Sequence, residues 1–115
     1  MSRLAMLFDA SKCIGCKGCQ VACKQWWGLP GSETEQTGSY ENPPDLGPNT
    51  WTRVTFHEYA EAGRTQWLFL AWGCVHCTQA ACVDVCPTAA LKHNETGLVS
   101  FERDLCNGCG YCTQA

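Results

Sequence analysis

Residues 13–28 read CIGCKGCQVACKQWWG, a short segment crowded with thiols. Two further segments have the same character, CVHCTQAACVDVCP at residues 74–87 and CNGCGYC at residues 106–112. We call these segments the first, second and third cysteine runs. Together they contain all 11 cysteines of the 115-residue chain. Self-similarity of this kind indicates an internal repeat, in which each run belongs to an equivalent structural element.

The spacing within the runs is typical of proteins that bind iron–sulfur clusters. The first run has the order C-x2-C-x2-C-x3-C, a known spacing of bacterial iron–sulfur proteins, and the second run ends in the Cys–Pro pair of the same pattern. Glycines between the cysteines let the backbone wrap tightly, so that several thiolates converge and amides reach the cluster sulfur. We expect every cysteine to bind cluster iron: Cys13, Cys16, Cys19, Cys23, Cys74, Cys77, Cys82, Cys86, Cys106, Cys109 and Cys112.

In two-cluster ferredoxins the last cysteine of a run binds the other cluster. Applied to the second and third runs, this rule predicts one ligand set that crosses between them: Cys86, Cys106, Cys109 and Cys112. The other cysteines of the second run then need a ligand that the spacing places directly after Ala115. The first run needs a partner run in the same way. We therefore expect a truncated chain that binds [4Fe-4S] clusters.

Zinc and disulfides are the alternatives for so many thiols. A zinc site typically takes two ligand pairs separated by a longer spacer, and the tight triplets of the first and third runs do not fit that arrangement. A disulfide framework suits exported chains, but the apolar stretch in MSRLAMLF is too short for a signal peptide of this chain's own. Large aliphatic residues are scarce, so metal centres are expected to help fill the interior.

The expected fold class is α+β, with ferredoxin-like 4Fe-4S modules in which a short strand, a cysteine loop and a short helix alternate. Strand-like segments precede the three runs at Leu4–Phe8, Gln66–Leu70 and Leu98–Phe101. Short helical turns are expected in QVACKQWW and ACVDVC, which follow the first loops of their runs. Residues Asn94–Gly97 are expected to turn a hairpin, because Gly97 supplies positive φ.

We divide the chain into three parts. Residues 1–27 form the first half of a split ferredoxin-like module, residues 28–65 an insertion loop and β-ribbon, and residues 66–115 a second module truncated before its last cysteine. Within the insertion, Gly28–Pro48 is rich in Gly, Pro, Ser and Glu and has no apolar periodicity. Such a connection is either a mobile surface loop or a functional one. The segment Asn49–Leu70 is expected to form the ribbon, turning at EAGR.

Charge and motif content exclude several classes of function. The net charge is −3, the pI is near 5.5, and Lys and Arg are scattered, so no nucleic-acid partner is expected. The sequence shows no nucleophile–base pair, phosphate loop or zinc-protease pattern. We therefore expect no catalytic residue in this chain, which is not an enzyme on its own.

Three residue types beside the cysteines have two interpretations each. His76 is expected to be a neighbour of Cys77 rather than a metal ligand. Lys24 stands where proline follows the last cysteine of the second run, and it either brings a positive charge near a cluster or is simply solvated. The tryptophans are expected to pack around clusters rather than relay electrons: Trp26, Trp27, Trp51, Trp67 and Trp72.

The cysteine motifs resemble those of the iron–sulfur (beta) subunits of molybdenum- or tungsten-dependent formate dehydrogenases. CKGCQVACKQW, CVHCTQAACVDVCPTAAL and CNGCGYC match the wider group of four-cluster electron-transfer subunits of molybdopterin oxidoreductases. TGSYENPPDLGPNTW looks like the formate dehydrogenase branch. The resemblance covers essentially the whole chain and about the amino-terminal half of such a subunit. It implies ferredoxin-like modules that relay electrons from a molybdopterin (Mo or W) catalytic subunit. It also implies three or four [4Fe-4S] clusters in the complete subunit.

The resemblance also implies partners and a location. Electrons would pass to a cytochrome b membrane subunit, a cytochrome c or a flavin module, in a membrane-associated complex on the periplasmic rather than the cytoplasmic side. An exported catalytic partner would carry the export signal. The alternatives are the equivalent subunit of a dimethyl sulfoxide, thiosulfate, polysulfide or nitrite reductase, and a free ferredoxin. The cysteine runs do not separate a reductase subunit from a formate dehydrogenase subunit, because fold does not determine the partner's chemistry. The Gly28–Pro48 connection and the Asn49–Leu70 ribbon count against a free ferredoxin, since a diffusible carrier has little use for them.

Overall fold

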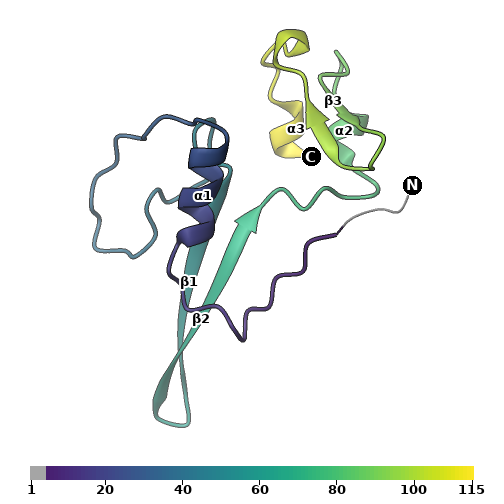
Figure 1. The fold of residues 1–115 in the computed structure, drawn as a ribbon. Coiled ribbons are helices and arrows are strands. Elements are labelled where there is room, and N and C mark those ends of the chain that lie inside the picture. Colours follow the sequence, from purple (N-terminus) through teal and green to yellow (C-terminus); the bar gives the residue numbers. More distant parts are fainter. Residues whose placement is uncertain (1–4) are drawn as a thin grey trace. The chain divides into compact units, whose positions relative to one another are not determined.

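The computed structural model describes residues 5–115, which separate into two compact units. The amino-terminal unit is Leu7–Cys74, and the carboxyl-terminal unit contains Val75–Ala115. Short helices and two small antiparallel sheets make up the regular structure (Figure 1). This mixed content of helices and strands agrees with the expected α+β class.

A long antiparallel ribbon is the main element of the amino-terminal unit. Strand β1 (Thr52–Glu61) pairs with β2 (Arg64–Gly73), from Thr52 opposite Gly73 to Glu61 opposite Arg64. The two turn residues, Ala62 and Gly63, have φ values of 49° and 75°. Positive φ at both positions matches the twist of a hairpin, so the ribbon and its turn at EAGR are as predicted.

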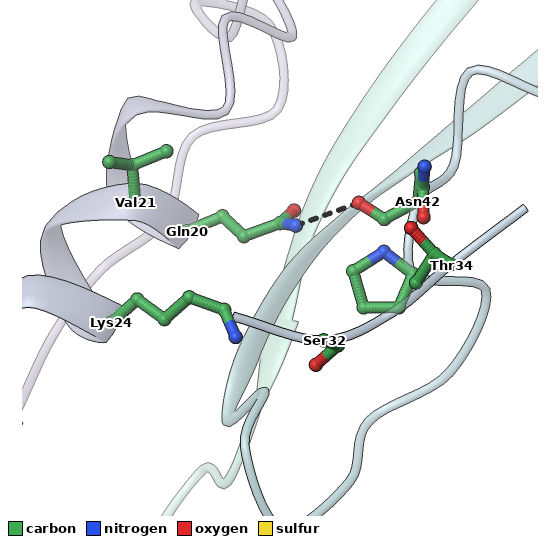
Figure 2. Close-up of a pocket in the computed structure, with 7 residues that line it drawn as sticks. Gln20, Val21, Lys24, Ser32, Thr34 and Asn42 are labelled. Atoms are coloured by element: carbon green, nitrogen blue, oxygen red, sulfur yellow. Dashed lines mark hydrogen bonds between the residues drawn. The ribbon is translucent and has the colours of Figure 1, made fainter. Parts of the chain in front are cut away.

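Helix α1 (Gly18–Trp26) lies against β1 and is tied to it by Gln20. The side chain of Gln20 is buried, with 9% of its surface exposed. Its Oε1 accepts the backbone N–H of Val54 at 3.1 Å, and its Nε2 donates to the carbonyl oxygen of Asn42 at 3.0 Å. One side chain thus joins the helix to a strand and to the irregular connection. Figure 2 shows the pocket beside this bridge, lined by Gln20, Val21, Lys24, Ser32, Thr34, Asn42 and Pro43.

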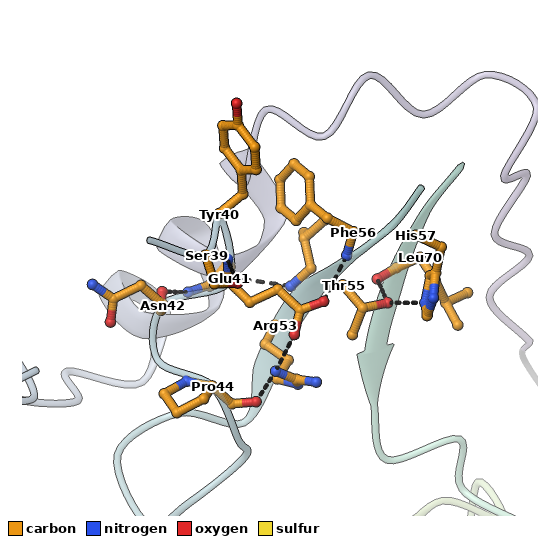
Figure 3. Close-up of polar contacts among 12 residues, drawn as sticks. Ser39, Tyr40, Glu41, Asn42, Pro44, Arg53, Thr55, Phe56, His57 and Leu70 are labelled. Atoms are coloured by element: carbon orange, nitrogen blue, oxygen red, sulfur yellow. Dashed lines mark hydrogen bonds and ion pairs between the residues drawn. The ribbon is translucent and has the colours of Figure 1, made fainter. Parts of the chain in front are cut away.

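The connection Gly28–Pro48 has no helix or paired strand, apart from a bridge between Gly47 and Thr50, but it is packed on the ribbon. Glu41 makes the central contact (Figure 3). Its Oε1 accepts the backbone N–H of Phe56 at 2.8 Å, and its Oε2 pairs with the Arg53 guanidinium at 3.2 Å. These bonds hold the middle of the connection in place.

Four short elements and a 3₁₀ turn make up the carboxyl-terminal unit: α2 (Ala81–Asp84), β3 (Leu91–His93), β4 (Val99–Phe101), the 3₁₀ turn η1 (Arg103–Leu105) and α3 (Tyr111–Gln114). Strands β3 and β4 form the expected hairpin. The Asn94 side chain organises its turn, because Oδ1 accepts the backbone N–H groups of Thr96 at 3.0 Å and Leu98 at 2.9 Å. Helix α2 contacts both α3 and β3.

The strand predicted at Leu4–Phe8 is absent over the residues that the structure describes. Leu4 lies outside them, and residues 5–8 have no regular structure. The prediction is therefore wrong for residues 5–8. A β-strand needs the backbone groups of a neighbour, and neither sheet in the described part of the chain includes this segment.

Very little apolar surface is fully buried. Within residues 5–115, the buried apolar side chains are Val54 in the amino-terminal unit and Ala80 and Ala90 in the carboxyl-terminal unit. So small a core agrees with the expectation that side-chain burial alone does not hold the fold together. None of the helices in this range is long and apolar enough to cross a membrane.

Candidate iron–sulfur site

The first cysteine run forms a loop that turns sharply between its thiols. Gly15 has a φ of 69° and Lys17 a φ of 61°, so the backbone enters the left-handed region on both sides of Cys16. The Gly15 N–H donates to the Cys13 sulfur and the Gly18 N–H to the Cys16 sulfur, each at 3.5 Å. Amides aimed at cysteine sulfur are what an iron–sulfur loop supplies.

The same turn recurs fully in the third run and at one of its two positions in the second. In the third run, Gly108 and Gly110 have φ values of 73° and 77°, which matches Gly15 and Lys17. In the second run, His76 takes the place of Gly15 with a φ of 52°. The predicted internal repeat is thus visible as repeated backbone geometry. Gly18 was expected to help the loop wrap, but it is the first residue of α1.

The later cysteines of each run lie on or next to a helix, as was predicted for the first and second runs. Cys19 and Cys23 are four residues apart in α1, so they share one face of the helix. Cys82 lies in α2, Cys86 follows α2 directly, and Cys112 lies in α3. Each run therefore has its first thiols in a loop and its later thiols on or next to a helix.

Aromatic rings pack behind the first loop. Gly15 lies so close to them that an added Cβ would be 2.9 Å from Phe69 Cδ1 and 3.1 Å from Phe56 Cε1. Phe56 and Phe69 are cross-strand neighbours with ring centres 5.2 Å apart, and Tyr40 and Trp67 extend the group. We call these four residues the aromatic cluster. Glycine is required here both for its φ and for the space.

The Cys86 thiol has a lowered pKa. Backbone hydrogen bonding at Leu91 is the largest influence, and with smaller contributions from Thr88 and Ala90 it outweighs desolvation and lowers the pKa of Cys86 from 9.0 to about 7. The Thr88 hydroxyl lies 3.8 Å from the sulfur. Because iron binds the thiolate, this environment suits a metal ligand.

His76 and Lys24 have structural partners. The backbone N–H of Val99 donates to His76 Nδ1 at 3.1 Å, which joins the second loop to β4. The Lys24 ammonium donates to the carbonyl oxygens of Pro30 at 2.9 Å and Asn49 at 2.6 Å. Lys24 therefore fastens the two ends of the connection and is not simply solvated.

The tryptophans differ among themselves. Trp67 belongs to the aromatic cluster, and Trp27 packs on Trp51 with ring centres 5.4 Å apart. Trp26 is 82% exposed and Trp72 is 50% exposed. Packing within the described chain therefore accounts for three of the five.

The chemistry of the donors fits an iron–sulfur cluster. In the first and third runs of the described chain, the seven cysteines are thiols that are not joined in disulfides. Across residues 5–115, no three His, Cys, Asp or Glu side chains are placed to hold one metal ion. A four-iron cluster takes four cysteine thiolates spread over its irons, so its ligands need not close on a single ion. The cysteine loops can supply such a ligand set, because they present several thiols and, in the first run, backbone amides that donate to sulfur.

The two units distribute the cysteines unequally. The amino-terminal unit contains the first run, whereas the carboxyl-terminal unit contains six cysteines of the other two: Cys77, Cys82, Cys86, Cys106, Cys109 and Cys112. Within that unit, α2 contacts α3, so the helices that follow the second and third loops are neighbours.

Repeated cysteine loops of this geometry, joined to short helices and small sheets, define an iron–sulfur electron-transfer module. The family model described as the 4Fe-4S dicluster domain matches residues 12–90, which include the first and second runs. The chain belongs to this family, and its cofactors are [4Fe-4S] clusters. The matched residues end before the third run.

Curated relatives are similar over nearly the whole chain. It is 41% identical over 112 residues to the iron-sulfur subunit of the nitrate-inducible formate dehydrogenase of Escherichia coli, covering 96% of this chain and 38% of the relative. It is 45% identical to the beta subunit of formate dehydrogenase 2 (cytochrome c-553) of Nitratidesulfovibrio vulgaris, covering 83% and 46%. It is 35% identical to a sulfite dehydrogenase subunit of Allochromatium vinosum, covering 100% and 48%. The chain thus spans less than half the length of these relatives.

Proposed function

We propose that this chain is part of the electron-transfer subunit of a formate dehydrogenase, and that it does not catalyse the oxidation itself. Its [4Fe-4S] clusters relay electrons from formate oxidation at a molybdopterin catalytic subunit to a downstream acceptor. The similarity to formate dehydrogenase iron–sulfur subunits supports formate as the electron donor, and membership of the 4Fe-4S family supports a role in electron transfer.

One observation carries the cluster-binding part of the proposal. Positive-φ loops present thiols and, in the first run, amides aimed at sulfur. Both positive-φ positions recur in the third run and one of them recurs in the second. Formate oxidation yields carbon dioxide, one proton and two electrons, and the clusters supply one-electron redox chemistry when bound. The residues of this chain bind the iron, donate hydrogen bonds to sulfur and hold the loops in place.

We assign all eleven cysteines as cluster ligands and keep the crossed set of Cys86 with the three cysteines of the third run. Its support is that the second and third runs, except for Cys74, lie in one compact unit where α2 contacts α3. We also keep the division of the chain into residues 1–27, 28–65 and 66–115. In that scheme, 28–65 is an insertion into a ferredoxin-like framework.

The proposed partners are a molybdopterin subunit containing Mo or W and an electron acceptor, which is a cytochrome b subunit, a cytochrome c or a flavin module. The relative from Nitratidesulfovibrio vulgaris has cytochrome c-553 in its name, which supports a cytochrome acceptor. We place the complex at the membrane on the periplasmic side. Cell fractionation into periplasm, membrane and cytoplasm, followed by detection of this chain, tests that location.

The test of function uses the native complex, purified anaerobically through a tag on the subunit that contains this chain. We expect a molybdopterin protein to co-purify and formate to bleach the visible absorption of the clusters. Dithionite added afterwards measures the total reducible cluster and serves as the control. Clusters that dithionite reduces and formate leaves oxidised would exclude formate as the electron donor.

A second candidate is supported by the similarity to the sulfite dehydrogenase subunit of Allochromatium vinosum. The same clusters would then serve a different molybdopterin partner, such as a sulfite dehydrogenase or one of the sulfur-compound, dimethyl sulfoxide or nitrite reductases. In the same preparation, reduction of the clusters by sulfite and not by formate would favour this candidate. Purification of the tagged subunit alone, with no molybdopterin protein, would favour a free ferredoxin.

A further inference from the structure

Lys17 has a left-handed backbone conformation, and the equivalent residue of the third run is a glycine. It directly follows Cys16 with a φ of 61°, and Gly110 directly follows Cys109 with a φ of 77°. Residues with a Cβ rarely adopt this conformation, since the side chain crowds the backbone. A strained non-glycine residue at a functional loop is a reason to ask what its side chain does.

The Lys17 side chain is held in place at its charged end. Its ammonium donates to the carbonyl oxygen of Tyr40 and lies 5.3 Å from the centre of the Phe56 ring. Phe56 stacks on Tyr40 with ring centres 5.6 Å apart, so the cation rests on one edge of the aromatic cluster. The charge is thereby fixed beside the first loop instead of moving freely in water.

Within the described part of the chain, the Lys17 ammonium has no carboxylate partner. Of the ion pairs formed within residues 5–115, none includes Lys17. The nearby Glu41 carboxylate, which follows Tyr40 in sequence, is paired with Arg53 at 3.2 Å. Lys17 is also only partly exposed, which reduces screening of its charge by water.

We propose that Lys17 sets the reduction potential of the cluster bound by the first cysteine run. This inference depends on the proposed function of that run as a cluster site. A bound cluster becomes more negative by one charge when it gains an electron. A fixed cation therefore stabilises the reduced form more than the oxidised form and raises the potential. Lys17 acts on the potential without binding iron.

The experiment is a potentiometric titration of the purified native complex, followed by electron paramagnetic resonance. Lys17→Met removes the charge and keeps most of the side-chain length. We expect one cluster to become about tenfold harder to reduce, which is a downward shift of about 59 mV for a one-electron couple. The potentials of the remaining clusters stay where they are. Lys17→Arg keeps the charge and is expected to stay close to the wild-type potential.

Two further variants separate charge from loop structure. Lys17→Gly also removes the charge but introduces the residue found at the equivalent place in the third run, so it relieves the backbone strain. It is expected to bind a full set of clusters and to show the same downward shift as Lys17→Met. Arg64→Gln makes the same change in net charge at the ribbon turn and is expected to leave every potential unchanged.

Unchanged potentials in Lys17→Met and Lys17→Gly would overturn the proposal. It would also be overturned if both variants, with Lys17→Arg intact, lost one cluster, because Lys17 would then only hold the loop. Failure of the proposed function looks different. In that case the wild-type complex has no cluster that depends on the first run. Cys16→Ala tests this through iron content alone, because the variant would then contain as much iron as the wild type.

Discussion

Single residues decide whether the cysteine loops can form, and Gly15 is the most constrained of them. Its φ of 69° and its contact with the aromatic cluster both require the absence of a side chain. Gly108 occupies the equivalent place in the third run with a φ of 73°, but an added Cβ there meets no atom within 4 Å. Alanine substitutions at Gly15 and Gly108 therefore separate two effects on stability: backbone strain, which both share, and steric overlap with the aromatic cluster, which occurs only at Gly15.

Gly15→Ala is expected to be more damaging than Gly108→Ala. Each variant loses about 1 kcal/mol by placing alanine in the left-handed region, and Gly15→Ala must also displace the Phe69 ring. Iron content and the thermal unfolding temperature of the purified complex measure the difference. We expect Gly15→Ala to lose one cluster while Gly108→Ala keeps its full iron content. Equal losses in the two variants would mean that the aromatic cluster does not constrain the loop.

The thiol of Cys86 gives a prediction about pH. Because the folded chain lowers its pKa from 9.0 to about 7, alkylation of Cys86 by iodoacetamide in the cluster-free chain should have its midpoint near pH 7. By linkage, this thiolate stabilises the folded chain fully above pH 9, and the contribution is lost as the pH falls through 7. Peptide mass spectrometry follows the modification, and the same chain in urea is the control. Identical midpoints in the two states would contradict the lowered pKa.

At the scale of elements, Gln20 is the contact that positions α1, and with it Cys19 and Cys23. Replacing it by leucine leaves the Val54 N–H and the Asn42 carbonyl without their side-chain partner, and a buried unsatisfied group costs about 1–3 kcal/mol. We expect Gln20→Leu to lower the unfolding temperature and to reduce iron retention. Gln25→Leu, on the exposed surface of the same helix, is the matched control.

The outcome for Gln20→Leu is informative in either direction. Loss of stability with iron retained would show that the cysteine loop alone positions its thiols. Stability equal to that of Gln25→Leu would show that the bridge between α1, β1 and the connection contributes nothing.

Regular elements were predictable because their signals are local. The turn at EAGR and the hairpin at Asn94–Gly97 depend on residues next to each other in sequence, and both are present. The packing of Gly28–Pro48 was not predictable, because Glu41, Lys24 and Gln20 hold it through side-chain hydrogen bonds to residues distant in sequence, which leave no periodic pattern. The strand expected at the start of the chain failed for a related reason, since pairing depends on a neighbour.

The cysteine loops were predictable, because spacing alone identifies a loop that carries thiols, whereas the binding of a cluster by each thiol stays a prediction. Two features of the site were not. The placement of Lys17 on the aromatic cluster depends on Tyr40 and Phe56, which belong to the connection and the ribbon. The lowered pKa of Cys86 depends on backbone groups at Leu91, beyond the run itself. Both features depend on tertiary contacts, which the spacing of the cysteines does not reveal.

At the scale of the whole molecule, the open question is which cysteines share a cluster. The family match covers the first and second runs, whereas the compact carboxyl-terminal unit joins most of the second run with the third. These observations favour different pairs of runs. The crossed ligand set predicts that Cys86 belongs with the third run, although Cys82 is nearer in sequence.

Cysteine-to-alanine variants of the native complex decide between the pairs. Cys86→Ala should remove the same cluster signal in electron paramagnetic resonance as Cys109→Ala, whereas Cys82→Ala should remove a different one. The double variant Cys86→Ala/Cys109→Ala should lose no more iron than either single variant, because both changes strike one ligand set. If Cys86→Ala instead removes the signal lost in Cys82→Ala, each run keeps its own four thiols. If it removes the signal lost in Cys16→Ala, Cys86 serves the cluster of the first run, and the pairing follows the family match.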